Sequence, residues 1–306
     1  MKVGVGSHRP PNPHPRSESA SATATEAESA SASASRIRIG IHGSPVTSCV
    51  SFLLLASGCT SALIREADRF AVVETTRDAA VADRKSRDAD DYFRLPRTAA
   101  RVEASLDASL GAVSSSIGFE GLWKAARAAV WLSERHDDPD RRHFFARRGL
   151  AIARESVRLS PERVEPHYYL ALCLARASEI ERTAKYLDEL AAAAARAIAK
   201  DEKFDRAGPL RALGLLHLRT EGKLLAGFGD LDEALRHLGR AALLFPEDAE
   251  NQIAYAEALL VDEDIAAARR AVAAALASSP PPDLEEEHRG WLAKARKLRE
   301  KIEASQ

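Results

Sequence analysis

Apolar residues recur at intervals of three and four along the chain from Ser61 onward, which is the spacing of one helix face. Leu187, Leu190 and Ala194 are one such set. No segment alternates apolar and polar residues as a half-buried strand does, and the chain contains no Asn-Gly or Asp-Gly hairpin turn. We therefore predict an all-α body in which helices are separated by short polar stretches.

The helical pattern itself repeats. The pattern Ala-x3-apolar-x2-Ala-x4-Pro ends at Pro246 and again at Pro280, 34 residues later. Looser copies occupy 149–161 and 190–202, and the two copies between Pro161 and Pro246 are longer by 7 and 10 residues. Small residues on one face allow two antiparallel helices to approach closely, and a proline begins the turn into the next pair. The residues expected to pack helix against helix are Ala171, Gly214, Ala234, Ala241, Ala256, Ala268 and Ala275.

The first helix of each pair opens with a pattern of its own. The four openings are Trp123-x2-Ala126-Arg127-x2-Val130, His167-x2-Leu170-Ala171-x2-Leu174, Leu210-x2-Leu213-Gly214-x2-His217 and Gln252-x2-Tyr255-Ala256-x2-Leu259. They resemble the Trp-x2-Leu-Gly-x2-Tyr opening of the tetratricopeptide repeat (TPR). The resemblance implies a TPR-like solenoid of helical hairpins with a C-terminal capping helix.

The chain divides into five segments on this basis. Residues 1–35 are a low-complexity lead, rich in Pro, Ser and Ala, that we expect to be disordered. Residues 36–58 have the order of a signal peptide, and 59–116 hold N-terminal helices, one over 62–94 and one over 97–113. About four TPR-like pairs fill 117–280, divided as 117–161, 162–204, 205–247 and 248–280. Residues 281–306 form the capping helix, and we predict that Asp230 and Asp283 cap the helices that follow them.

The signal-like segment ends in a motif with its own resemblance. Two arginines precede an uncharged stretch with an apolar centre at 52–56, which is shorter than the ~18 residues of a spanning helix. The small residues before Cys59 resemble the lipobox of bacterial lipoproteins, although Ala56 stands where that family usually has Leu. The resemblance implies cleavage before Cys59, lipidation of its thiol and, because Thr60 follows, an outer-membrane anchor facing the periplasm. The alternative is a buried helix followed by an ordinary free cysteine.

The order of the repeats narrows the resemblance further. Over about residues 95–280 the chain is similar to bacterial TPR lipoproteins such as the T component associated with tripartite (TRAP-type) solute transport systems. That similarity implies a place beside a transport system and a periplasmic solute-binding protein as a candidate partner. TPR lipoproteins serve many systems, however, and a fold does not settle a function.

Charge and motif content exclude several classes of function. With 44 basic and 45 acidic residues the net charge is −1, so the overall charge gives no electrostatic reason to expect nucleic-acid binding. The chain has no nucleophile elbow, Walker loop or zinc-protease motif, so we expect no enzymatic activity and no cofactor. The cluster 136–143 matches no zinc or calcium spacing and is predicted to be a polar loop, so no metal is expected. Cys173 lies among leucines and is predicted to be a buried, inert thiol.

These observations favour a non-enzymatic adaptor in the cell envelope that holds a protein or peptide partner. In a TPR stack the first helix of each pair lines the concave face. The alternative is an accessory ligand-binding component of a TRAP-type uptake system. Lys124, Arg127 and Arg211 would make such a groove basic and suited to an acidic peptide or a carboxylate. The candidate groove residues are Lys124, Arg127, His167, Tyr168, Arg211, Asn251 and Gln252.

Overall fold

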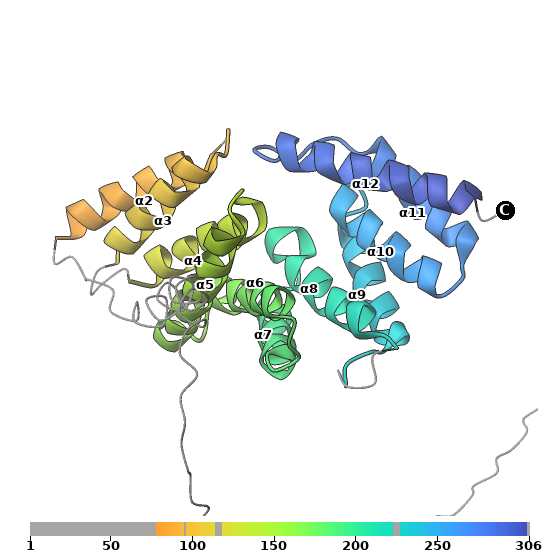
Figure 1. Cartoon of the computed structure of the whole chain (residues 1–306), viewed down its shortest axis with the longest axis horizontal. Helices are drawn as coiled ribbons and strands as arrows, with labels where there is room; N and C mark the ends of the chain where they lie inside the picture. Colours follow the sequence, from red (N-terminus) through yellow and green to blue (C-terminus); the bar gives the residue numbers. More distant parts are fainter. Residues whose placement is uncertain (1–77, 95, 114–117, 223–226, 305–306) are drawn as a thin grey trace, which may run out of the picture. The chain divides into compact units, whose positions relative to one another are not determined.

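The computed structural model describes residues 78–94, 96–113, 118–222 and 227–304, all within the compact unit Val50–Gln306. These residues contain eleven helices and no strand, so the predicted all-α class is confirmed (Figure 1). Cys59, the signal-like segment and residues 62–77 of the first expected helix lie outside the described residues.

The first described hairpin consists of α2 (Ala79–Phe93) and α3 (Ala99–Gly111), which pack against each other. Asp78 begins α2 by accepting hydrogen bonds from the backbone N–H groups of Ala80 and Val81. Thr98 begins α3 in the same way, through the backbone N–H of Arg101. Because α3 also packs on the next helix, this hairpin is stacked on the repeats that follow.

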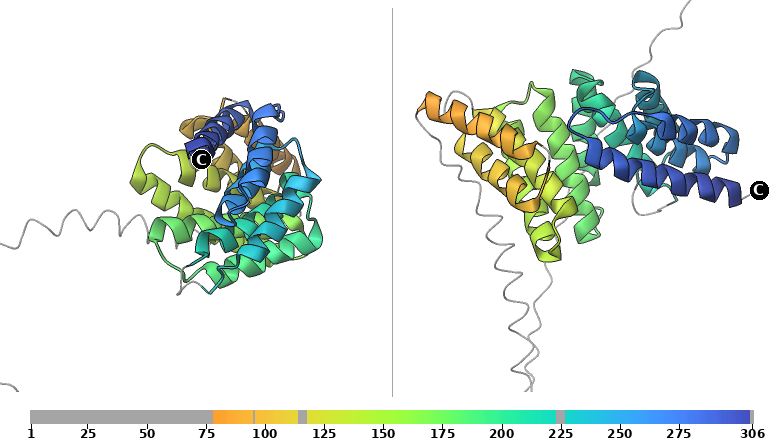
Figure 2. Two further views of the ribbon diagram at one scale, coloured as in Figure 1. Left: turned by 90° about the vertical axis from the view of Figure 1, so that its right-hand side faces the viewer. Right: turned by 90° about the horizontal axis from the view of Figure 1, so that it is seen from above.

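Four further hairpins and a final helix complete the fold. Within each hairpin the two helices pack together, and successive first helices also contact one another, from α2 through α4, α6, α8 and α10 to α12. This arrangement is the helical-hairpin solenoid predicted from the sequence, with α12 packed on α10 and α11 at its end (Figures 1 and 2). The helices are α4 (Gly118–Arg135) with α5 (Pro139–Leu159), α6 (Val164–Glu181) with α7 (Leu187–Lys200), α8 (Phe204–Thr220) with α9 (Leu231–Leu244), α10 (Ala249–Val261) with α11 (Ile265–Ala277), and α12 (Glu285–Ala304).

Aspartate side chains begin several of these helices. Asp230 accepts a hydrogen bond from the backbone N–H of Glu233 at 3.0 Å, so its predicted role as the N-cap of α9 is confirmed. Asp138 caps α5, which accounts for the acidic cluster at 136–140 as a loop and helix start. The prediction for Asp283 is wrong in position. Because α12 starts at Glu285, Leu284 holds the cap position, and Asp283 lies before it in a left-handed turn with φ of 61°.

The small residues of the repeat pattern are where helices touch. All seven predicted packing residues are buried. The closest approach is at Gly214 of α8, where an added Cβ would lie 2.6 Å from Leu238 Cγ and 3.1 Å from His237 Cβ on α9. Only a glycine permits that separation of the two helices.

The alanine-rich interior extends along the stack. One cluster of buried apolar residues joins α3 to α8, and smaller clusters join α8 through α12. None of the helices described here combines the length and the apolar character that crossing a bilayer requires.

Candidate binding hollow

A hollow of about 490 Å³ opens among the first helices of the hairpins. Its walls come from α2, α4, α6, α8, α12 and the segments just before α3 and α12, which is the face on which the sequence analysis expected a partner groove. Most of its lining is charged or aromatic. Those lining residues are Asp90, Phe93, Arg94, Arg97, Arg127, Trp131, Glu134, Arg135, Tyr169, Asp205, Arg206, Asp283, Glu287 and Trp291.

An ion pair joins the two ends of the described stack beside this hollow. Arg97 Nη1, between α2 and α3, lies 2.8 Å from Glu287 Oε1 on α12, although 190 residues separate them. The two side chains are only 6% and 10% exposed. Arg97 is also fixed to its own hairpin, because its Nε donates to the backbone oxygen of Phe93 at 2.8 Å. Figure 1 shows the end of α2 and the start of α12 facing each other.

Of the seven groove residues predicted from the sequence, Arg127 of α4 is the one that lines the hollow. Its guanidinium carbon lies 4.0 Å from the ring centre of Phe93 and 5.3 Å from that of Trp123. Its Nη2 donates to Asp90 Oδ1 at 3.1 Å. Stacking and the ion pair together fix the orientation of the guanidinium.

Three residues that line the hollow carry a buried polar atom with no hydrogen-bond partner among the described residues. These atoms are Arg127 Nε, Trp131 Nε1 and Glu287 Oε2. The first two are N–H donors and the third is a carboxylate acceptor. Each of these atoms is shielded from solvent, so it lies behind the surface of the hollow rather than on it.

The charges of the lining are balanced. Arg94, Arg97, Arg127, Arg135 and Arg206 stand against Asp90, Glu134, Asp205, Asp283 and Glu287. The predicted basic groove is therefore not what the structure contains, and an acidic ligand has no net electrostatic advantage there.

Glu134 of α4, which lines the hollow, has a raised pKa. The surrounding protein removes water from its carboxyl group, and this desolvation raises the pKa. Arg176 and Arg135 act in the opposite direction, while the charge of Glu250 adds to the rise.

The wall contributed by α8 begins in an unusual backbone turn. Asp205, Arg206 and Ala207 have φ values of 47°, 53° and 62°, three consecutive left-handed residues, none of them glycine. Each such residue costs roughly 1–2 kcal/mol, so neighbouring contacts must hold the turn. Tyr168 donates to Asp205 Oδ2 at 2.7 Å, and Arg206 Nε donates to Asp248 Oδ2 at 2.8 Å. The strained turn places Asp205 and Arg206 in the lining.

The other six predicted groove residues are buried, and their side chains contact other residues of the protein instead of facing the hollow. Asn251 donates to the backbone oxygen of Arg206 at 2.9 Å and accepts a hydrogen bond from Arg211 at 2.6 Å. These two side chains therefore stabilise the strained turn. Lys124 Nζ is paired with Asp90 Oδ2 at 2.8 Å. Their burial corrects the expectation that they line an open surface. The six are Lys124, His167, Tyr168, Arg211, Asn251 and Gln252.

Two of these six occupy equivalent positions in their repeats. His167 Nε2 lies 2.8 Å from the backbone oxygen of Pro161, and Gln252 Nε2 donates to the backbone oxygen of Pro246 at 3.1 Å. In both repeats the first residue of the opening pattern turns back to the proline carbonyl six residues earlier. The polar side chain at the first position of the pattern thus links neighbouring hairpins, which explains why it is buried.

Helical spacing could have revealed part of the hollow. Arg127, Trp131 and Glu134 lie at i, i+4 and i+7 on α4 and therefore share one face. Arg97, Arg206 and Glu287 carry no local signal, because distant segments and a strained turn bring them together. Cys173, in contrast, is buried as predicted, and burial raises the pKa of its thiol far above the ordinary value.

One comparison with known proteins supports the fold. No protein-family model matches the chain, and no curated protein matches it either. A solved structure of a thermophilic TPR protein from Thermus thermophilus superimposes with a TM-score of 0.50 at 19% sequence identity. The match covers 69% of this chain and 99% of that one. The fold is therefore TPR-like, as the sequence predicted.

Proposed function

We propose that the protein is a non-enzymatic adaptor that binds a partner protein by taking an extended peptide segment into the hollow. The observation that carries the proposal is the hollow of about 490 Å³, whose lining brings together aromatic and charged side chains from several hairpins. The TPR-like fold supports the proposal, since its stacked hairpins present an extended binding face.

The lining also indicates what kind of segment would fit. Phe93, Trp131 and Trp291 offer aromatic surface, and both acidic and basic side chains line the rest of the hollow. Aromatic and arginine side chains are the ones that dominate binding energy at protein interfaces. We expect a segment with an apolar anchor and mixed charges rather than a purely acidic one.

A small solute is the second candidate, and the size of the hollow favours it. Ligand pockets for small molecules commonly span about 300–1,000 Å³, and this hollow falls in that range at about 490 Å³. A zwitterionic or carboxylate solute would pair with the charged side chains of the lining. That function would agree with an accessory role in a TRAP-type uptake system, the alternative that the sequence resemblance suggests.

Site-specific crosslinking distinguishes these functions. A photoreactive phenylalanine analogue at Trp131 should crosslink a discrete partner in cells, whereas the same analogue at Leu159, exposed on α5, should not. The charge reversal Arg135→Glu in the hollow should weaken capture of that partner, and the matched reversal Arg158→Glu on α5 should leave it unchanged. Equal crosslinking from both positions would contradict the adaptor proposal. A small molecule retained by the gently purified protein in native mass spectrometry would favour the solute instead.

We also propose that Cys59 anchors the mature protein to a bacterial membrane, with the outer membrane as its site. The support is the sequence order of basic residues, an apolar centre and small residues before the cysteine. Cys59→Ser should release the protein from membranes on fractionation. If the wild type and the variant fractionate alike, and mass spectrometry finds residues 36–62 intact, there is no such anchor.

A further inference from the structure

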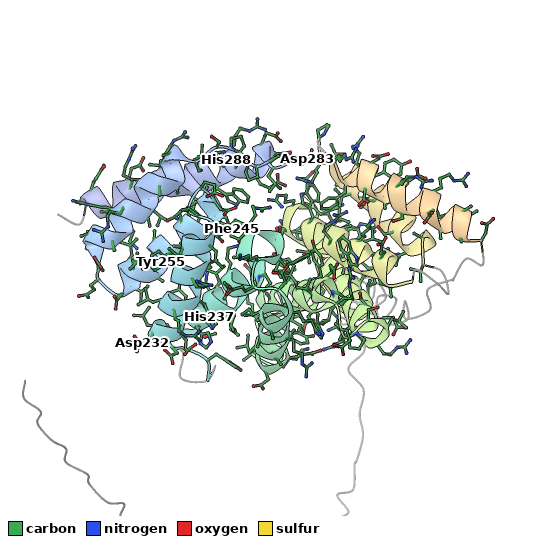
Figure 3. The ribbon with its side chains drawn as sticks, turned by 180° about the vertical axis from the view of Figure 1, so that it is seen from behind. Asp232, His237, Phe245, Tyr255, Asp283 and His288 are labelled. Atoms are coloured by element: carbon green, nitrogen blue, oxygen red, sulfur yellow. The ribbon has the colours of Figure 1, made fainter. Side chains whose placement is uncertain are left out.

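Three potential metal ligands meet where α8 and α9 pack together, away from the hollow. His217 belongs to α8, and Glu233 and His237 belong to α9, four residues apart on one helix face. One ligand atom from each side chain lies within 4.8 Å of the other two. Figure 3 shows His237 between Asp232, near the start of α9, and Phe245, which follows its end. The spacing on α9 and the closeness of α8 are both needed to bring the three together.

The close approach of the two helices places the ligands. Gly214, one turn before His217, leaves room for the backbone of α9 beside His237. The rings of His217 and His237 consequently lie nearly parallel, with centres 6.2 Å apart and planes inclined by 15°. His237 Nε2 lies 3.4 Å from Glu233 Oε2. Ligand bonds of about 2.0–2.2 Å in a tetrahedral zinc site place neighbouring ligand atoms about 3.4 Å apart, so this pair already has the required separation.

The hydrogen bonds of His217 select the ring nitrogen that could bind a cation. His217 Nδ1 lies 2.7 Å from the backbone oxygen of Phe228. A carbonyl oxygen only accepts, so Nδ1 carries the proton and Nε2 keeps a free lone pair. Histidines that ligate metals are commonly oriented in this way, with the second nitrogen donating to a backbone carbonyl.

A cationic side chain of the protein already occupies the acceptor side of the cluster. The guanidinium of Arg236 lies within hydrogen-bonding distance of Glu233 Oε2, and its Nη2 lies 3.0 Å from His237 Nε2. These are the lone pairs that a metal ion would use. The Arg236 side chain is 61% exposed, so it can move into solvent without breaking the helix packing.

We propose that His217, Glu233 and His237 form a binding site for a divalent transition-metal ion, with Arg236 as the group that the ion displaces. Two imidazole nitrogens and one carboxylate oxygen suit zinc and its neighbours rather than magnesium or calcium, which prefer oxygen ligands alone. Three protein ligands leave a fourth position for water or for a ligand from a partner. The ion would join α8 to α9 beside the connection 221–230.

Titration of the untagged protein with Zn²⁺, followed by calorimetry, tests the proposal. His237→Gln and Glu233→Gln should each weaken binding by about tenfold or more, since even residues that only hydrogen-bond to metal ligands contribute about 10–100-fold. Arg236→Gln should strengthen binding, because it removes the competing cation. His143→Gln, which changes a histidine outside the cluster, is the matched control and should leave the affinity unchanged.

The Arg236 variant makes the test independent of any loss of folding in the ligand variants. Its side chain is exposed, so its replacement leaves the helix packing intact. Substituting Co²⁺ for Zn²⁺ should also give the visible absorption of a tetrahedral site in the wild type and not in His237→Gln. Unchanged or weaker Zn²⁺ binding by Arg236→Gln, or equal binding by wild type and His237→Gln, would overturn the proposal.

Discussion

The ion pair between Arg97 and Glu287 should couple the N-terminal hairpin to α12 energetically. Both side chains are almost fully buried, and the charged atoms lie 2.8 Å apart. The perturbation is a double-mutant cycle of Arg97→Ala, Glu287→Ala and the pair together. Each single change leaves one charge buried without its partner, while the double change removes both charges.

The expected magnitude follows from the burial and the distance. At an effective dielectric constant of about 20, unit charges 2.8 Å apart attract by about 6 kcal/mol, and the loss of hydration offsets much of that gain. Removal of one partner from a buried pair typically costs about 3–5 kcal/mol. Arg97 keeps its bond to the backbone oxygen of Phe93 in Glu287→Ala, which places the loss in that variant at the lower end. We expect a coupling energy of about 1–3 kcal/mol.

Urea unfolding followed by circular dichroism measures the free energies of the cycle. An internal control is the pair Arg154 and Glu189, which joins α5 to α7 with side chains 49% and 40% exposed. Exposed pairs contribute about 0–1 kcal/mol, so this second cycle should give a much smaller coupling. Acrylamide quenching of tryptophan fluorescence reports on the hollow, because Trp131 and Trp291 both line it.

Two results would refute the reasoning. A coupling energy for Arg97 and Glu287 below about 0.5 kcal/mol would mean that the two residues act independently in solution. Unchanged quenching in both single variants would mean that the ion pair does not close the hollow. Either outcome would remove the structural basis for treating α12 as one of its walls.

Three further predictions concern single positions. Gly214→Leu should cost about 1–3 kcal/mol by overpacking α8 against α9, and unchanged thermal midpoints for this variant and Ala256→Leu would contradict the repeat register. Burial lowers the pKa of His167, so the unfolded chain takes up its proton first and stability falls as the pH drops below about 6.5. His167→Gln should reduce this loss of stability at low pH. If the variant and the wild type gave identical curves of stability against pH, His167 would not be its source. Asn251→Ala should cost about 1–3 kcal/mol in urea unfolding, because it removes the shorter of the two bonds to the carbonyl of Arg206 and the acceptor of the buried Arg211 Nη1. A loss near zero would contradict the role assigned to these bonds.

Local spacing was enough to predict the fold. Apolar residues spaced three and four positions apart specify helices, and small residues such as Ala234 and Gly214 specify where two helices touch. Both signals depend only on neighbours within one hairpin and its copy 34 residues away. The helix start at Asp230 was predictable for the same reason, since a cap is an interaction between residues three apart.

The same local reasoning failed for most of the groove residues. The sequence places His167 and Gln252 on the first helix of their pairs, and a polar residue there suggests a groove. Their side chains instead bind the carbonyl of the proline that ends the previous hairpin. A polar side chain can recur from copy to copy because the stack needs it, so repetition itself argued for structure rather than for binding. Trp131 and Glu287, which do line the hollow, are not repeat positions of that pattern.

The departures from the 34-residue period lie where the structure has its unusual features. The longest copy of the repeat, between Glu202 and Pro246, contains both the left-handed turn at 205–207 and the connection 221–230 between α8 and α9. The equivalent connection in the last pair, 262–264, is much shorter. The left-handed turn brings Asp205 and Arg206 into the hollow, and the long connection brings the carbonyl of Phe228 to His217. A regular TPR hairpin needs neither feature to pack, and a strained turn persists only where its surroundings hold it. The breaks in the period, rather than the period, are therefore the part of this sequence that indicates where binding is to be sought.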